Sequence, residues 1–203
     1  MIIETFTVGM LSTNCYVVNS EKSKEAIVID PGLDLPFEAQ QIFDYIAKEK
    51  LNVKLILNTH GHQDHISGDA IFQKKYNIPI YIHKYDASSI EELETSKFPA
   101  PVLLEDGSLI KFDNESLKVM VTPGHTPGSI CLVGEKLVFT GDTLFNEGIG
   151  RTDFPGGSMR DMRLSLRKLV RLPDYFLIYP GHGPTSIVGE EKRNNPFLVG
   201  TDF

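Results

Sequence analysis

The sequence predicts an α+β fold in which two mixed β-sheets pack together and helices cover their outer faces. The chain passes through a group of strands followed by helices, and its second half repeats that order. The strand segments include both alternating and continuous apolar runs, which is typical of sheets buried on one or both faces. A length of 203 residues without a linker or short repeat predicts a single domain over 1–203.

The first half is expected to hold five strands and three helices. Apolar stretches between turn-forming residues predict strands over 2–8, 14–20, 25–32, 53–60 and 78–83. A change to helical spacing at Phe37, Ile42 and Ile46 predicts an amphipathic helix over 36–50. Further helices are expected over 69–76 and 86–94.

The second half opens with four expected strands, over 108–112, 116–122, 129–133 and 136–142. Ser158 then begins a helix, since the tetrapeptide SMRD fits a capping box ahead of Met162, Leu166 and Leu169. A last strand is expected over 175–182, followed by a tail rich in polar residues and turns.

Composition restricts the possible partners. A net charge of −7 and an isoelectric point near 5.4 argue against binding nucleic acid through its phosphates. The sequence has neither an apolar run of about 18 residues nor a basic secretory start, so we expect a cytoplasmic protein without a membrane partner. Cys15 and Cys131 lie in separate apolar strands and are expected to be reduced, buried thiols. No heptad pattern indicates an oligomeric state.

Metal-ligating side chains gather where predicted strands end. In the stretch THGHQDH, His60 and His62 point the same way from extended backbone, and Asp64 and His65 follow at the turn. Three further strand ends, each beside glycine, present His125, Asp142 and His182. Imidazole and carboxylate are ligands that borderline divalent metals prefer, so these seven donors predict a metal centre. His83 lies alone in a strand and is expected to be structural.

The stretch THGHQDH matches the T-H-x-H-x-D-H signature, and the sequence thereby resembles the metallo-β-lactamase fold superfamily. The IDPG segment at 29–32 is similar to that family's early strand-end aspartate. The resemblance implies a four-layer αββα sandwich. The segments GDTLFNEGIGRTDFPGGS and PGHGPTSIVGEEKRNNPFL resemble the glyoxalase II, or hydroxyacylglutathione hydrolase, branch and its short members.

The resemblance also implies a ligand set for two divalent ions. His60, His62 and His125 would hold the first ion, and Asp64, His65 and His182 the second, with Asp142 bridging them. Zinc is the expected metal, although iron and manganese suit the same ligands. The implied reaction is hydrolysis of a small-molecule thioester, such as S-lactoylglutathione, by a metal-bridged hydroxide that Asp64 orients.

Two neighbouring features leave alternatives open. Asp30 is either a partner that fixes a ligand histidine or a residue of an Asp-Pro-Gly turn. Arg151 and Asp153 either contact substrate or pair with each other to shape their loop, and we favour the second.

Full-length glyoxalase II enzymes carry a C-terminal helical region that binds glutathione. Only 21 residues follow His182, so we expect that region to be missing and the carrier thiol to be open.

Four rival functions remain. The first is a mononuclear-iron persulfide dioxygenase, which shares a GRTDF-like stretch but uses fewer ligands. The second is a nuclease of the ribonuclease Z kind, which the acidic net charge disfavours. The third is a metal-binding protein without catalysis. A β-lactamase is the fourth, and we disfavour it because we find no export signal.

Overall fold

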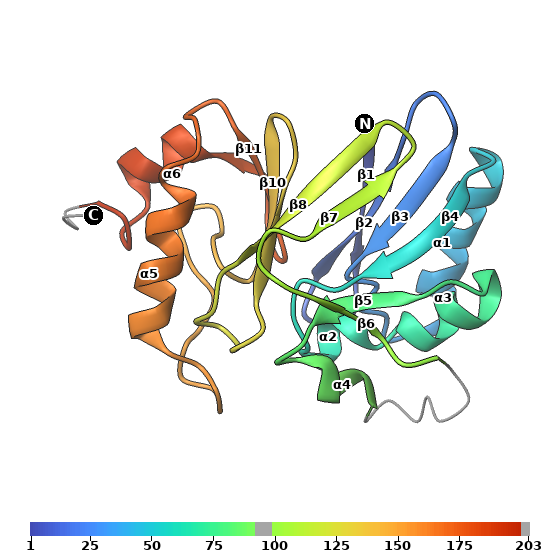
Figure 1. The fold of residues 1–203 in the computed structure, drawn as a ribbon, viewed down its shortest axis with the longest axis horizontal. Helices are drawn as coiled ribbons and strands as arrows, with labels where there is room; N and C mark the ends of the chain where they lie inside the picture. The colour runs from blue at the N-terminus through green and yellow to red at the C-terminus, as the bar shows by residue number, and fades with distance from the viewer. Residues whose placement is uncertain (92–98, 200–203) are drawn as a thin grey trace.

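The computed structural model describes residues 1–91 and 99–199 and contains two six-stranded sheets (Figure 1). The first sheet holds, in spatial order, β1 (Ile2–Val8), β2 (Thr13–Asn19), β3 (Glu25–Ile29), β4 (Asn52–Leu57), β5 (Ile80–His83) and β6 (Val102–Leu104). The second holds β12 (Ser186–Ile187), β11 (Leu177–Pro180), β10 (Leu137–Gly141), β9 (Ile130–Val133), β8 (Glu115–Val121) and β7 (Leu109–Phe112).

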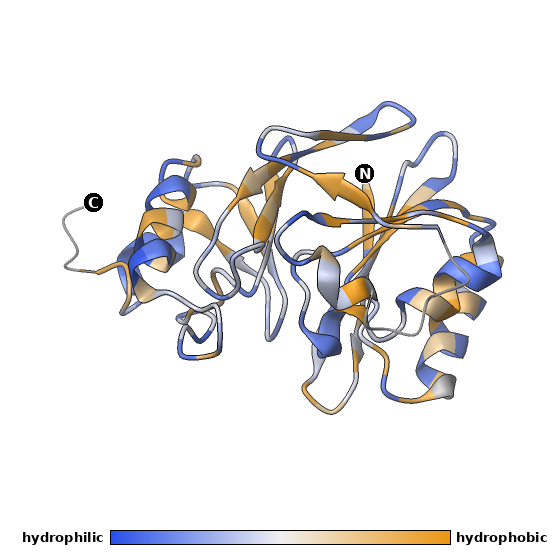
Figure 2. Cartoon of the chain, turned by 60° about the horizontal axis from the view of Figure 1, so that its bottom comes forward, coloured by the Kyte–Doolittle hydropathy of each residue, from blue (hydrophilic) through white to orange (hydrophobic). Residues whose placement is uncertain are grey.

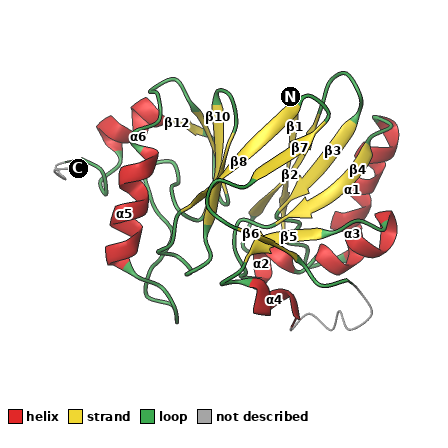
Figure 3. Cartoon of the chain, viewed as in Figure 1, coloured by secondary structure: helices red, strands yellow, loops and turns green. Residues whose placement is uncertain are grey.

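Both sheets are mixed, as predicted. In the first sheet β1, β2 and β3 pair antiparallel, and the pairs from β3 through β6 are parallel. In the second sheet β10 and β11 are parallel and the remaining pairs are antiparallel. The helices are α1 (Pro36–Lys48), α2 (Gln63–Ile66), α3 (Asp69–Tyr76), α4 (Ala87–Glu91), α5 (Met159–Leu169) and α6 (Val188–Asn194). Figure 3 shows α1 and α3 outside one sheet and α5 and α6 outside the other.

Three hydrophobic clusters hold the four layers together. In β3, Ala26 and Val28 face the cluster beneath α1 and α3, whereas Ile27 and Ile29 face the cluster between the two sheets. A third cluster lies between the second sheet and α5 and α6. The continuous apolar strands are therefore buried on both faces, as an αββα sandwich requires. In Figure 2 the hydrophobic colour is concentrated in the strands, and the helices carry hydrophilic stretches between apolar ones.

The predicted start of α5 is confirmed. Ser158 has extended backbone, and its hydroxyl accepts the N–H of Asp161 at 3.2 Å. Met162, Leu166 and Leu169 are buried on the inner face of this helix. The helical spacing and the serine cap therefore act together to set both the first residue and the orientation of α5.

The structure differs from the sequence prediction in four short elements. The four-residue helix α2 and the three-residue strand β6 were not predicted, and the tail expected to be turns contains β12 and α6. Val188 at the start of α6 packs into the third cluster, which explains why this polar segment folds back. The helix expected over 86–94 is described only as α4, because residues 92–98 lie outside the described part of the chain.

Cys15 and Cys131 are buried free thiols, as expected. Within residues 1–91 and 99–199, none of the helices combines the length and apolarity needed to cross a bilayer.

Candidate metal centre

The seven predicted donors meet at one edge of the sandwich. His60 and His62 follow β4, His125 follows β8, Asp142 follows β10, and His182 follows β11, so four strand ends deliver them. A hydrogen bond links the two sheets at this edge, where the Asn14 N–H donates to the Gly181 carbonyl at 2.7 Å. Rigid strands therefore position side chains that are far apart in the sequence.

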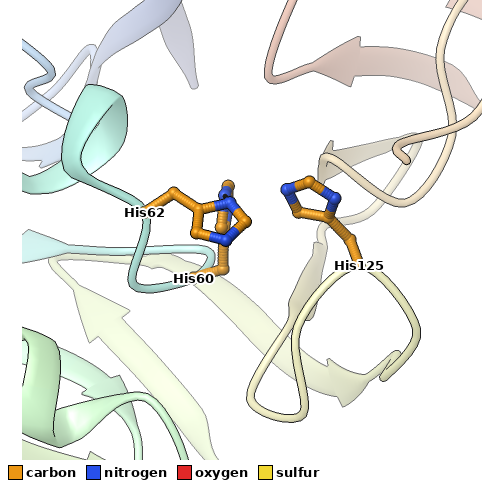
Figure 4. A group of neighbouring side chains, drawn as sticks. All are labelled: His60, His62 and His125. Atoms are coloured by element: carbon orange, nitrogen blue, oxygen red, sulfur yellow. Dashed lines mark hydrogen bonds between the residues drawn. The ribbon is translucent and has the colours of Figure 1, made fainter. Parts of the chain in front are cut away.

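The first group consists of His60, His62 and His125 (Figure 4). One ring nitrogen from each lies within 4.8 Å of the others, and the His60 Nε2 to His62 Nδ1 distance is 3.2 Å. Figure 4 shows His125 approaching from a different loop, with its ring facing the other two. Three imidazoles in this arrangement suit one divalent cation.

The second group consists of Asp64, His65 and His182, which also lie within 4.8 Å of one another. His182 Nε2 is 3.2 Å from both His65 Nε2 and Asp64 Oδ2. Asp64 and His65 belong to α2, a four-residue helix that turns the chain directly after His62. The turn brings these two side chains beside the His182 loop.

Asp142 lies between the two groups. Its Oδ2 is 3.4 Å from His125 Nε2, and its Oδ1 is 3.5 Å from His65 Nε2. One oxygen of its carboxylate also forms a third set of potential ligands with ring nitrogens of His60 and His65, all within 4.8 Å of one another. This is the position that the family resemblance implies for a bridging ligand, and that role remains a prediction.

Outer hydrogen bonds orient three of the imidazoles. His125 Nδ1 is 2.7 Å from the Arg151 carbonyl, and His182 Nδ1 is 3.0 Å from the Leu11 carbonyl. His65 Nδ1 is 3.0 Å from Asp30 Oδ2. Because carbonyl and carboxylate oxygens only accept, each Nδ1 carries a proton, and a bound metal ion would take the lone pair of each Nε2 in place of a second proton.

Burial and neighbouring charges shift the pKa values of His60 and His65 in opposite directions. Burial, followed by the neighbouring imidazoles, lowers the pKa of His60 well below its usual value, so its ring is neutral. Burial also opposes protonation of His65, but the charges of Asp142 and Asp30 outweigh it and raise its pKa to about 9. Burial alone would raise the pKa of Asp64, yet the hydrogen bond from His182 and the charge of His65 lower it. Asp64 is therefore ionised at neutral pH.

The cluster fits a divalent metal. His125 Nε2 and Asp142 Oδ1 are buried, face the cluster, and have no hydrogen-bond partner among the described residues. Buried polar atoms are rarely left unpaired, so two such atoms beside five other donors indicate a cation site. Gly181 keeps the space open, because a Cβ there would lie 2.1 Å from Asp142 Oδ1 and 2.9 Å from His65 Cε1.

Asp30 fulfils both roles considered for it. Its backbone has a φ of +48°, and its carbonyl accepts the Gly32 N–H at 2.8 Å, which forms the turn. Its buried carboxylate accepts the Thr59 N–H and hydroxyl, both at 2.7 Å, in addition to facing His65. The turn thus aims a carboxylate at a ligand histidine from behind.

Arg151 and Asp153 pair with each other. The guanidinium donates to both carboxylate oxygens, at 2.9 and 3.0 Å, and stacks 3.9 Å above the centre of the Phe154 ring. This bidentate pair favours the loop-shaping interpretation. The Arg151 carbonyl, rather than its side chain, contacts His125.

His83 lies outside all three groups of potential ligands. It is buried, its Nδ1 accepts the Tyr85 N–H at 3.4 Å, and burial lowers its pKa. We expect His83→Ala to keep its full metal content, as elemental analysis would measure, while losing about 0.5–3 kcal/mol of unfolding free energy. Loss of metal from a folded His83→Ala variant would contradict the ligand assignment.

Two residues that support the metal-ligating side chains or their loops were not predicted from the sequence. The Thr13 hydroxyl donates to Asp64 Oδ2 at 3.1 Å and holds that carboxylate against the cluster. Asp86 binds the loops that carry His60 and His125. Asp86 follows β5, so the strand-end pattern that revealed the other donors applies to it too, whereas Thr13 begins a strand and gives no such signal.

The cluster opens into a cleft of about 460 Å³. Its walls are partly apolar, formed by Leu11, Phe145, Ile149 and Phe154. His62, Asp64, His125, Asp142 and His182 also line it, and Arg151 is the cation among its described lining residues. A cleft of this size, apolar with convergent polar groups, is typical of a small-molecule site.

Residues 8–182 match the family model described as the metallo-beta-lactamase superfamily, and the chain belongs to that superfamily. It is a metal-dependent hydrolase whose histidine and aspartate cluster suits two divalent ions. The chain is similar to hydroxyacylglutathione hydrolase GloC of Haemophilus influenzae, with 35% identity across 98% of each protein.

Solved structures with the same fold are similar to the chain over nearly its whole length. ETHE1 from Myxococcus xanthus superimposes with a TM-score of 0.87 and 30% identity, over 99% of this chain and 86% of that one. TTHA1623, crystallised in a di-iron-bound form, gives a TM-score of 0.82 and 31% identity, over 96% of this chain and 100% of its own. The predicted family and fold class are therefore confirmed.

Proposed function

We propose that the chain hydrolyses thioesters of the S-2-hydroxyacylglutathione type, with S-lactoylglutathione as the representative substrate. The observation that carries the proposal is the cleft that five of the seven donors, including the ionised Asp64, line together with an apolar wall. The similarity to GloC supports this substrate class.

Asp64 orients the attacking nucleophile in this proposal. Its carboxylate is held by Thr13, borders the cleft and is ionised, so it can accept a hydrogen bond from an attacking water and orient it. Divalent ions bound by the cluster would lower the pKa of a water molecule from about 15.7 to near 7, which supplies hydroxide at neutral pH.

The residues around the cleft favour a thiolate as the leaving group. Apart from the cluster itself, Arg151 is the only titratable side chain among the described lining residues, and it remains protonated. An alcohol or amine would need a general acid in order to depart. A thiol, with a pKa of about 8.5, leaves as the anion without one.

The walls of the cleft suit a short acyl group and the carbon skeleton of a thiol carrier. Leu11 and Phe145 lie on the side of His182, and Phe154 packs edge-on against His62 with ring centres 5.6 Å apart. Arg151 offers one guanidinium to a carboxylate of the carrier, although Asp153 already engages it. We propose zinc as the bound metal, with iron or manganese as alternatives.

Purified protein should be analysed for metal content and assayed with S-lactoylglutathione and with coenzyme A and bacillithiol thioesters of the same acid. The proposal predicts metal-dependent thiol release that a chelator abolishes and added zinc restores. The variant Asp44→Ala, at an exposed position of α1 whose carboxylate accepts the Gln40 amide, serves as the control that retains activity. Metal-loaded protein that cleaves none of these thioesters would contradict the proposal.

A persulfide dioxygenase with one iron is the second candidate. The group His60, His62 and His125 can hold a single ion by itself, which is the observation that favours it. The separate supports of Asp64, His65 and His182 favour the hydrolase, because a one-ion enzyme has no use for them. Sulfite release from glutathione persulfide by the iron-loaded protein, without thioester cleavage, would decide for the dioxygenase.

A further inference from the structure

We propose that Asp86 is a positioning residue that holds the three histidines of the first group in ligand geometry. Asp86 lies in the turn between β5 and α4, and its side chain is not among the seven donors. The residue is only 5% exposed. A buried carboxylate needs several donors to offset its desolvation, and the identity of those donors reveals its role.

All three donors come from loops that carry first-group histidines. Asp86 Oδ2 accepts the Gly61 N–H at 2.9 Å and the Thr126 hydroxyl at 2.6 Å. Its Oδ1 accepts the Gly128 N–H at 2.9 Å. Gly61 separates His60 from His62, and Thr126 directly follows His125. One carboxylate therefore joins the loop after β4 to the loop after β8.

Close packing shows that both loops lie directly on the turn 86–89. A Cβ on Gly128 would lie 2.4 Å from Asp86 Oδ1, and a Cβ on Gly61 would lie 2.6 Å from Ser89 Oγ. Glycine is thus required at both positions for the backbone to approach the carboxylate.

The carboxylate itself is fixed in place. The Asp86 N–H donates to the His83 carbonyl at 3.0 Å, and the Asp86 carbonyl accepts the Ser89 N–H at 3.1 Å. On the other side, Ser129 Oγ lies 2.8 Å from the Thr126 hydroxyl and accepts the Thr126 N–H at 3.0 Å. A rigid turn is therefore connected to a rigid loop through both oxygens of one carboxylate.

The second group has separate supports. His65 is held by Asp30, His182 by the Leu11 carbonyl, and Asp64 by Thr13. None of these three bonds involves Asp86. Loss of the Asp86 carboxylate should therefore weaken the first metal position selectively, because the outer partners of a ligand typically contribute 10- to 100-fold to metal affinity.

The test is a zinc titration of the full chain in competition with a chromophoric chelator, without substrate. Reference variants His125→Ala and His182→Ala identify which affinity belongs to each group. In Asp86→Ala we expect the first-group affinity to fall about 10- to 100-fold and the second-group affinity to change by less than about threefold.

Two conservative variants grade the effect. Asp86→Asn keeps a carbonyl oxygen for Gly61 and Thr126 but turns its amide toward the Gly128 N–H, so a smaller loss is expected. Thr126→Val removes one of the two bonds from Asp86 to the His125 loop, together with the hydroxyl contact to Ser129, and should give a smaller loss of the same kind. Because Asp86 and Thr126 share one bond, Asp86→Ala with Thr126→Val should be less than additive. Asp106→Asn, which removes the charge of an exposed carboxylate that accepts the Val121 N–H, should leave both affinities unchanged.

Equal weakening of both groups in folded Asp86→Ala would overturn the proposal, because it would indicate general structural support. Unchanged affinities would overturn it as well. Circular dichroism and the melting temperature establish folding, and if Asp86→Ala does not fold, the same criteria apply to Thr126→Val. The readout is zinc binding alone, so the result is independent of the proposed thioester substrate.

Discussion

Asp142→Ala is expected to lose bound metal and hydrolytic activity together. Asp142 is the donor that approaches both groups, since its two oxygens lie 3.4 Å from His125 Nε2 and 3.5 Å from His65 Nε2. Removing one charged partner from a buried set of this kind costs about 3–5 kcal/mol, which corresponds to a loss of affinity of about 10²- to 10⁴-fold. Elemental analysis after dialysis, paired with the thioester assay, measures both quantities.

Asp44→Ala is the control for this experiment, because it removes an exposed carboxylate of α1 that is bonded to Gln40. It should retain metal and activity. Full activity in Asp142→Ala, or loss of activity with both ions still bound, would contradict the role assigned to Asp142.

Asp30→Asn is expected to weaken the second metal position while preserving the fold. The asparagine oxygen can still accept the Thr59 N–H, but its amide nitrogen would take the place of Oδ2 and donate toward His65 Nδ1. That bond moves the ring proton to Nε2, which faces the cluster and then has no lone pair for a metal. We expect zinc affinity at the second group to fall by at least 10- to 100-fold.

Asp113→Asn provides a matched control. Asp113 also has left-handed backbone, with a φ of +53°, and its carboxylate accepts the Ser20 hydroxyl far from the cluster. Asparagine tolerates this backbone conformation at both positions, so neither variant should be strained. Zinc affinity in Asp30→Asn equal to that of the unmodified chain would show that Asp30 does not set the proton on His65.

The residues that determine the fold carry strong local signals. β3 is continuously apolar because both of its faces are buried, and α5 has both a serine cap and helical spacing of its buried side chains. The short elements β6 and α6 have neither. Each forms because tertiary contacts are available, such as Glu191 of α6 accepting the Glu147 N–H at 2.8 Å. Local sequence contains no information about that partner.

The same distinction applies to the metal centre. His60, His62 and Asp142 could be predicted because their side chains are metal-ligating types placed beside glycine at strand ends. Thr13 and Asp86 act through ordinary hydrogen bonds to residues at least 25 positions away. Their importance depends on which loop the fold brings beside them, and this required the three-dimensional structure.

The central claim is that side chains from four strand ends form a cage for a pair of divalent ions. The most direct measurement is anomalous diffraction at the zinc edge from crystals grown with zinc. We predict two peaks about 3.5–4 Å apart: one beside His60, His62 and His125, the other beside Asp64, His65 and His182, with Asp142 between them. Crystals with no anomalous peak at this edge of the sandwich, or with zinc bound only elsewhere, would contradict the account.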